Sequence, residues 1–214
     1  MVEKLSTEAG IPKPRVAVMP SPVPNAFATG RSPSHAVVAV TDSITRLLNR
    51  EELEAVIAHE LSHVKNRDVL TLTIASFIAM IATIIMQNAW LFSLGDRREG
   101  SPWLIAWIVA IVVWIVSTLL IRSLSRYREF AADRGSAYIT GQPKALISAL
   151  YKISGRMDMV PADKKRAVEG ANAFFIIPAL SGDTLMELFS THPPLEKRVA
   201  ALEQVAEEMG YSPR

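Results

Sequence analysis

Two long uncharged stretches constrain the fold of this 214-residue chain more than any other feature. Residues 69–95 and residues 100–121 contain no Asp, Glu, Lys or Arg, and the four charged residues 96–99 separate them. At about 1.5 Å per residue, each stretch can cross roughly 30 Å of hydrocarbon as a helix. The pattern predicts a transmembrane helical hairpin. The alternative is a pair of buried core helices, which is disfavoured because two such stretches in succession are rare in a domain of this size.

Basic residues outnumber acidic ones where the predicted hairpin meets the rest of the chain. They are Arg50, Lys65 and Arg67 before the first stretch, and Arg122, Arg126, Arg128 and Arg134 after the second. The connection between the stretches carries two arginines and two acids. This distribution predicts that the parts outside the hairpin lie on the cytoplasmic side. The formal net charge is only +2, so nothing indicates a nucleic-acid partner.

The sequence contains no cysteine, and its first residues lack the apolar core of a signal peptide. Disulfides, thiolate metal sites and a cysteine nucleophile are therefore excluded. Any metal ion must be bound by His, Asp or Glu. We expect no cleaved leader, so that membrane insertion depends on the internal apolar stretches.

Short apolar runs near the N-terminus predict a small sheet. Residues 15–19 and 36–41 have strand character, and residues 25–30 form a third short strand or edge. The prolines of residues 20–24 cannot be helical and predict an ordered loop.

Helices are predicted on both sides of the hairpin. Asn49 is expected to cap a helix whose third residue, Glu52, completes a capping box. Pro143 suits the first turn of a later helix, and a last helix is expected from near Pro194 to near Gly210. The fold class predicted is therefore α+β and mainly helical.

Residues 59–63, His-Glu-Leu-Ser-His, match the pattern H-E-x-x-H on a predicted helix. Residues four apart share one helical face, so His59 and His63 can bind one zinc ion. Glu60 is rotated by about 100° from His59. Its carboxylate is therefore expected beside the metal, where it can act as the general base toward the attacking water. A chance match is the alternative, which the helix-capping signal disfavours.

A catalytic zinc ion of this kind needs a third protein ligand and one open position. With the hairpin turn near residue 97 or 98, antiparallel helices bring the two histidines level with residues 132–136. Glu129 and Asp133 lie within one turn of that level and share a helical face. We predict that Glu129 is the third ligand and that Asp133 accepts the ring N–H of one histidine. The alternatives are surface ion pairs, of Glu129 with Arg122 or Arg126 and of Asp133 with Arg134.

Three other polar residues are weaker candidates. His192 precedes two prolines and can stabilise the oxyanion of a tetrahedral intermediate, or it can cap or pack against the last helix. Asn25 follows the proline-rich loop and can bind the substrate backbone near an edge strand, or it can be an ordinary turn residue. His35 is expected to be a surface loop residue.

Several segments in this order resemble the HtpX family of heat-shock-linked membrane zinc proteases, which are relatives of the CAAX prenyl protease. The segments are residues 24–30 (PNAFATG), 59–63 (HELSH), 128–133 (REFAAD), 172–178 (NAFFIIP) and 190–199 (STHPPLEKRV). The segments are spread along the chain, so the resemblance extends over nearly the whole sequence. Members of that family usually carry two further membrane spans ahead of the segment at Asn25, and this sequence has none there.

The resemblance implies an endopeptidase in quality control of damaged or misassembled membrane proteins. It implies an active site on the cytoplasmic face of the inner membrane. It also implies one zinc ion per chain on His59, His63 and Glu129, with Glu60 as the base, in agreement with the interpretation from the residues.

The complete prediction is a zincin-like metalloprotease with the hairpin inserted between the helices that carry the zinc ligands. Residues 1–68 hold the sheet and the H-E-x-x-H helix, residues 69–124 the hairpin, and residues 125–214 the third-ligand helix and the C-terminal helices. The partners predicted are the lipid bilayer and protein substrates, mainly membrane proteins. A non-catalytic membrane scaffold and a zinc exopeptidase are the alternative functions. Ligand type alone does not exclude cobalt or manganese.

Overall fold

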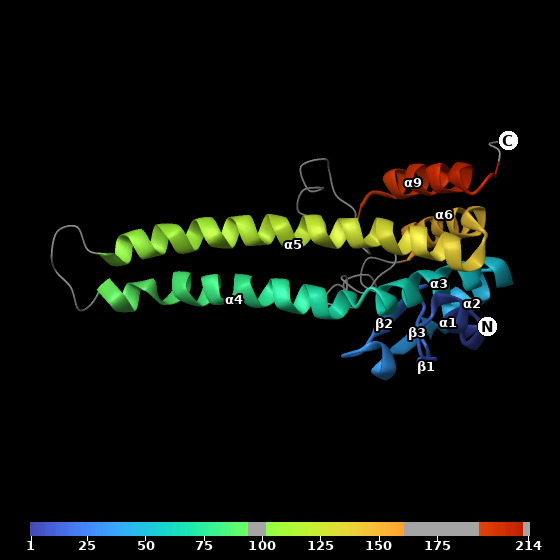
Figure 1. The fold of residues 1–214 in the computed structure, drawn as a ribbon, viewed down its shortest axis with the longest axis horizontal. Coiled ribbons are helices and arrows are strands. Elements are labelled where there is room, and N and C mark those ends of the chain that lie inside the picture. Colours follow the sequence, from blue (N-terminus) through green and yellow to red (C-terminus); the bar gives the residue numbers. More distant parts are fainter. Residues whose placement is uncertain (94–101, 161–192, 212–214) are drawn as a thin grey trace.

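The computed structural model describes residues 1–93, 102–160 and 193–211. A long two-helix arm extends from a small domain (Figure 1). The arm consists of α4 (Asp68–Ser93) and α5 (Pro102–Thr140), which lie side by side. The sheet and the remaining described helices gather at one end of the arm, where the N-terminus lies.

The domain contains a three-stranded sheet with the order β1-β3-β2. Its strands are β1 (Arg15–Met19), β2 (Ala26–Thr29) and β3 (Val37–Thr41), which confirms the three predicted strands. The central strand β3 runs parallel to β1 and antiparallel to β2. A short 3-10 helix, η1 (Pro33–His35), joins β2 to β3 and leaves His35 exposed, as predicted. In the described sheet, β2 is an edge strand, and it packs against α3.

The helix α3 (Arg50–Lys65) begins at the predicted capping box. The Asn49 side chain accepts from the Glu52 backbone N–H at 2.9 Å, and the Glu52 carboxylate accepts from the Asn49 N–H at 2.9 Å. Both bonds satisfy backbone donors that a helix N-terminus otherwise leaves unpaired. Two short helices that the sequence analysis did not predict, α1 (Val2–Ala9) and α2 (Asp42–Leu47), flank the sheet segment.

The helix α5 crosses the whole length of the structure without a break. Its first part belongs to the arm, and its last part packs against α3 in the domain. Where the two helices cross, a Cβ atom added to Gly135 would lie 2.4 Å from the Ser62 Oγ. The Ser136 hydroxyl donates to the Ala55 carbonyl of α3 at 2.6 Å. Small residues at this crossing therefore let the two backbones approach closely.

Two C-terminal helices complete the domain. They are α6 (Pro143–Met159) and α9 (Leu195–Glu208), close to the predicted positions. The apolar stripe of α6 enters the same core as α3, with Leu146, Leu150 and Ile153 fully buried. The protein is mostly helical with a small sheet, as predicted.

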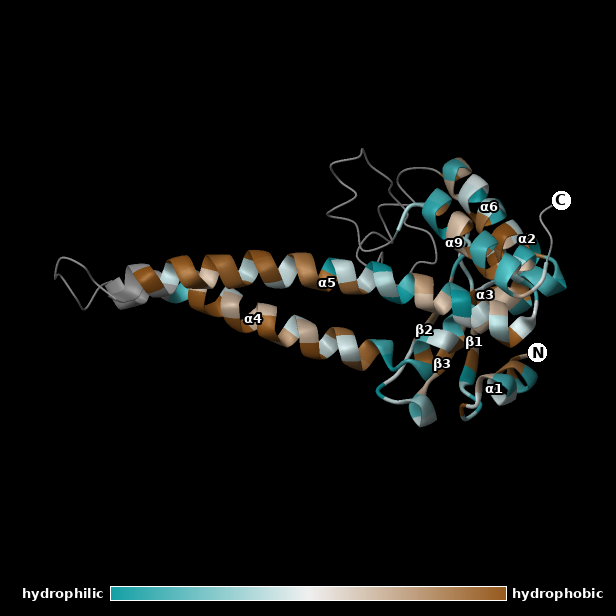
Figure 2. Cartoon of the chain, turned by 45° about the horizontal axis from the view of Figure 1, so that its top comes forward, coloured by the Kyte–Doolittle hydropathy of each residue, from teal (hydrophilic) through white to brown (hydrophobic). Residues whose placement is uncertain are grey.

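The arm exposes an apolar surface. Figure 2 shows hydrophobic residues along both arm helices, while hydrophilic residues are frequent on the domain. Residues 68–88 and 107–140 are long and apolar enough to cross a membrane. In the most apolar 18-residue part of each, only 6% of the residues of the first and 11% of the residues of the second are buried inside the protein. Core helices of a soluble protein would be mostly buried, so this alternative does not fit the arm.

Candidate metal centre

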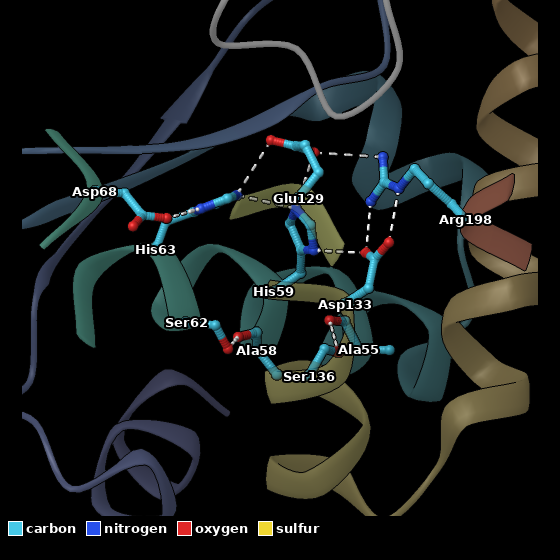
Figure 3. A network of polar contacts seen from close by, with 10 residues as sticks. All are labelled: Ala55, Ala58, His59, Ser62, His63, Asp68, Glu129, Asp133, Ser136 and Arg198. Atoms are coloured by element: carbon cyan, nitrogen blue, oxygen red, sulfur yellow. Dashed lines mark hydrogen bonds and ion pairs between the residues drawn. The ribbon is translucent and has the colours of Figure 1, made fainter. Parts of the chain in front are cut away.

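The H-E-x-x-H histidines and Glu129 meet where α3 packs against α5 (Figure 3). The two histidine Nε2 atoms are 3.1 Å apart. The Glu129 carboxylate lies opposite them, with one oxygen 3.7 Å from the His59 Nε2 and the other 3.6 Å from the His63 Nε2. Among the residues that the structure describes, these three form the one cluster of His, Asp and Glu with metal-ligand spacing.

Each histidine has a carboxylate behind it. The His59 Nδ1 lies 2.9 Å from an Asp133 oxygen, and the His63 Nδ1 lies 2.6 Å from an Asp68 oxygen. Because a carboxylate accepts, each Nδ1 carries a proton, and in the neutral imidazole each Nε2 then keeps a lone pair. Two lone pairs and a carboxylate then face one another, an arrangement that is repulsive unless a cation lies between them.

The donor spacing fits a metal ion. Tetrahedral zinc with bonds of about 2.0–2.1 Å to nitrogen places neighbouring donors about 3.3 Å apart. The three observed separations span 3.1–3.7 Å. Two imidazoles and a carboxylate are also a ligand set typical of catalytic zinc, with the fourth position left for water or substrate.

The hairpin geometry predicted this meeting to within one helical turn. The sequence analysis placed the two histidines level with residues 132–136, and the partners found are Glu129 for His63 and Asp133 for His59. The predicted levels were residue 132 for His63 and residue 136 for His59, so each partner lies three residues nearer the arm than predicted. The ion pair proposed as the alternative for Asp133, with Arg134, differs from what is found, since Asp133 contacts Arg198 and Arg134 contacts Glu208.

Glu60 lies next to the triad in a buried position. Burial disfavours its charged form and raises the pKa of its carboxyl, while the nearby histidines and a backbone hydrogen bond from Ala28 act in the opposite direction. The hydrogen bond connects Glu60 to the edge strand β2. Burial alone would lower the pKa of His63, but the hydrogen bond with Asp68 and the charges of Glu129 and Glu60 raise it.

Arg198, on α9, binds the back of the site and was not predicted. Its guanidinium donates to both Asp133 oxygens, at 2.8 Å and 2.6 Å, and lies 3.6 Å from a Glu129 oxygen. The side chain is buried, and the charges of Asp133 and Glu129 outweigh burial and raise its pKa. One signal in the sequence could have found it, because Arg198 falls on the apolar stripe of its helix between Leu195 and Leu202.

Asp68 and its partner Arg128 were also not predicted. Asp68 is the first residue of α4, and its second oxygen lies 3.0 Å from the Arg128 Nε on α5. The available signal was a lone acid five residues after His63, directly before the first uncharged stretch.

The roles of two of the three weaker candidates, Asn25 and His192, remain predictions. Asn25 is buried directly before β2, and its backbone N–H donates to the Thr41 hydroxyl at 2.9 Å. His192 lies outside the described residues.

The fold and the site together define a mostly helical protein with a candidate His-His-Glu metal centre. The sequence matches the model of peptidase family M48 over residues 1–206, so the chain belongs to this family. This confirms the resemblance seen in the motifs, and family and donor cluster together support a metalloprotease.

Relatives of similar sequence are named as proteases. Protease HtpX homolog 2 of Methanosarcina acetivorans is 62% identical over 212 residues, which cover 98% of this chain and 72% of that protein. Protease HtpX homolog of Moorella thermoacetica is 56% identical over 214 residues, with the same coverage of 98% and 72%.

The crystal structure of S. mikatae Ste24p has a similar fold. Its TM-score is 0.58 at 19% identity, and the match covers 94% of this chain and 49% of that one. The chain thus spans about half the length of that protein, and the likeness concerns the fold alone.

Proposed function

We propose that this protein is a membrane-anchored zinc endopeptidase that cuts damaged or misassembled membrane proteins. One observation carries the proposal: His59, His63 and Glu129 converge with metal-ligand spacing beside the buried carboxylate of Glu60. In this proposal the two histidines and Glu129 hold one zinc ion per chain. The catalytic domain is then zincin-like, with the membrane-spanning part of the arm inserted in the sequence between His63 and Glu129.

The residues around the site have separate roles in the proposed reaction. A bound zinc ion supplies Lewis acidity, which lowers the pKa of water to about 7 and polarises a carbonyl. Glu60 accepts the proton of the attacking water and later donates it to the leaving nitrogen. A pKa raised by burial suits this double role, because a less acidic carboxyl takes up a proton more readily.

The edge strand β2 offers a place for the substrate. Among the described residues it is hydrogen-bonded to another strand, β3, on one side only, and Ala28 in β2 hydrogen-bonds to Glu60. An extended peptide that adds to β2 would therefore run past the general base. Asn25, directly before β2, is proposed to bind the substrate backbone, and His192 is proposed to stabilise the oxyanion.

The exposed apolar arm supports a membrane location. In the proposal α4 and α5 cross the inner membrane and the domain lies on the cytoplasmic side, where the basic residues near the base of the arm favour it. The site then lies close to the bilayer, which favours substrates that are themselves membrane proteins.

The test compares the detergent-purified, zinc-loaded chain with Glu60→Gln on an unfolded protein substrate. Loss of a general base lowers the rate by about 10²–10⁴-fold. We expect both proteins to retain one zinc ion, measured by metal analysis, and only the unmodified chain to cut at this rate. Glu203→Gln, on the exposed face of α9, is the matched control and is expected to cut normally.

The other outcomes contradict specific parts of the proposal. Equal cleavage by Glu60→Gln would assign the activity to a contaminant. Zinc binding without cleavage in either protein would favour the scaffold, and products shortened only from their ends, identified by mass spectrometry, would favour an exopeptidase.

A further inference from the structure

The joint between α3 and α4 directs a carboxylate onto a metal-ligand candidate. The backbone of Arg67 adopts φ 55°, a left-handed conformation that a residue with a side chain seldom takes. This turn ends α3 and starts α4 at Asp68. The Asp68 side chain is only 4% exposed, and one of its oxygens lies 2.6 Å from the His63 Nδ1. The strained turn thus lies directly before the residue that holds the histidine ring.

The second oxygen of Asp68 forms an ion pair with Arg128. It lies 3.0 Å from the Nε of Arg128, whose side chain is 13% exposed. Arg128 precedes the candidate ligand Glu129 on α5. The first residue of one arm helix is therefore bound at the same time to a histidine of the site and to an arginine of the other arm helix (Figure 3 shows Asp68 against His63).

The other histidine, His59, also contacts a carboxylate that is bound in turn by an arginine, but that arginine lies on a different helix. His59 is followed by Asp133 and then by Arg198, whose helix α9 belongs to the domain. On the His63 side, both partners come from the base of the arm. His59 is thus held by α5 and α9, through Asp133 and Arg198, whereas His63 is held by α4 and α5, through Asp68 and Arg128.

We propose that Asp68 is a positioning residue that fixes the tautomer and ring orientation of His63, and that Arg128 acts on His63 through Asp68. In this way the two arm helices together set the affinity of the site for its metal ion. The inference rests on the proposed function, because it needs His63 to be a metal ligand. A carboxylate in this position keeps the proton on Nδ1 and leaves the Nε2 lone pair toward the metal.

The test measures zinc affinity of the full chain in detergent, by competition with a chromophoric chelator. It compares the unmodified chain, Asp68→Asn, Arg128→Gln and the double variant. Removal of such a partner lowers metal affinity by about 10–100-fold. We expect a loss in this range for Asp68→Asn and a smaller loss for Arg128→Gln. If Arg128 acts through Asp68, Arg128→Gln causes little further loss once Asp68 is replaced.

A control and a second measurement separate positioning from general stability. Glu208→Gln breaks another ion pair of α5, with Arg134 at 2.8 Å, and is expected to leave zinc affinity unchanged. Unfolding temperatures of the metal-free proteins show whether a variant has lost its fold. Should Asp68→Asn not fold, Arg128→Gln decides: weaker zinc binding at an unchanged metal-free unfolding temperature supports the inference.

Two results would overturn the inference while leaving the proposed function intact. One is a zinc affinity of Asp68→Asn equal to that of the unmodified chain. The other is a loss from Arg128→Gln that is equally large with and without Asp68. An unmodified chain that binds no zinc would overturn the proposed function as well.

Discussion

Glu52 shows how one buried carboxylate joins two helices of this domain. It belongs to the capping box of α3, and it also accepts from the Ser148 hydroxyl and the Lys152 ammonium of α6, at 2.7 Å and 2.8 Å. Burial would raise its pKa, but these hydrogen bonds and the Asn49 backbone outweigh burial and lower it below 4.5. The folded protein therefore favours the charged form.

We predict that Glu52→Gln lowers the free energy of unfolding by about 1–2 kcal/mol at pH 7, through loss of a charged hydrogen-bond acceptor. Because the folded-state pKa is lowered, this contribution is complete above about pH 4.5 and is lost as the pH falls through the folded-state pKa. The stabilities of the two proteins should therefore converge in acid.

Thermal unfolding followed by circular dichroism at several pH values measures this difference. Glu51→Gln, at the exposed neighbouring position, is the control and should match the unmodified chain at every pH. A constant gap between Glu52→Gln and the unmodified chain down to pH 3 would contradict the prediction.

Some residues of the site could be predicted from a local sequence pattern, whereas others depend on contacts between elements. His59, Glu60 and His63 follow from a local pattern on one helix, and so did the capping box at Glu52. Asp68 and Arg198 could not be predicted in the same way, because their roles depend on how the α3–α4 joint bends and where α9 packs. A sequence shows a buried charge on an apolar stripe, but it does not show which partner that charge meets.

At the scale of elements, the site depends on how closely α3 and α5 approach each other. Gly135 permits this approach, because an added Cβ would lie 2.4 Å from the Ser62 Oγ and 2.9 Å from the Ser62 Cβ. Ser62 is buried, and its hydroxyl donates to the Ala58 carbonyl at 2.9 Å, so it has little room to move.

We predict that Gly135→Ala separates the two helices and lowers the free energy of unfolding by about 1–3 kcal/mol, the usual cost of overpacking. Zinc affinity should fall too, since Glu129 lies on α5 and the histidines lie on α3. Thermal unfolding and chelator competition measure the two effects.

Two further variants test the cause. Ser62→Gly in the Gly135→Ala background removes the clashing side chain and should restore much of the zinc affinity. Gly155→Ala, in α6 where an added Cβ meets nothing within 4 Å, should stabilise the protein slightly. A Gly135→Ala protein with unchanged affinity would show that the close crossing does not set the site geometry.

Elements were predictable where a short-range rule applied. The uncharged stretches, the capping box and the position of Pro143 each fixed a helix. The hairpin then predicted the level of the partners on α5 to within one helical turn, because a sequence fixes the centre of such a connection only to one or two residues. The short helices α1 and α2 also have local signals, which the sequence analysis did not use: Gly10 ends α1 in the left-handed conformation, and Thr41 caps α2. Both helices pack against other elements of the domain, α1 against α3 and α2 against β3 and α6.

At the scale of the whole molecule, the proposed orientation places the arm tip and the domain on opposite sides of a membrane. The natural chain contains no cysteine, so a single introduced thiol has no background. We predict that Glu203→Cys, on exposed α9, and Arg97→Cys, in the connection of the arm, react with a membrane-impermeant thiol reagent from opposite sides. Intact cells and inside-out vesicles provide the two sides.

Labelling of both positions from one side would contradict a membrane-spanning arm. Labelling from opposite sides, with Arg97→Cys reactive in inside-out vesicles, would retain the span but reverse the orientation. Each labelled protein should first be shown to bind zinc, so that only folded chains are compared.

The unbroken helix α5 also sets the distance between the candidate metal site and the membrane. From Ile121, the last residue of the second uncharged stretch, to Glu129 the helix rises about 12 Å. In the proposed orientation, a substrate peptide bond reaches the site only if it lies about 12 Å from the hydrocarbon of the membrane. For a substrate anchored in the same bilayer, this distance takes about four extended residues. The length of α5 would thus set the minimum distance between the membrane and the cleaved bond. Peptide bonds nearer to a substrate's own membrane span would not be cut, whatever their sequence.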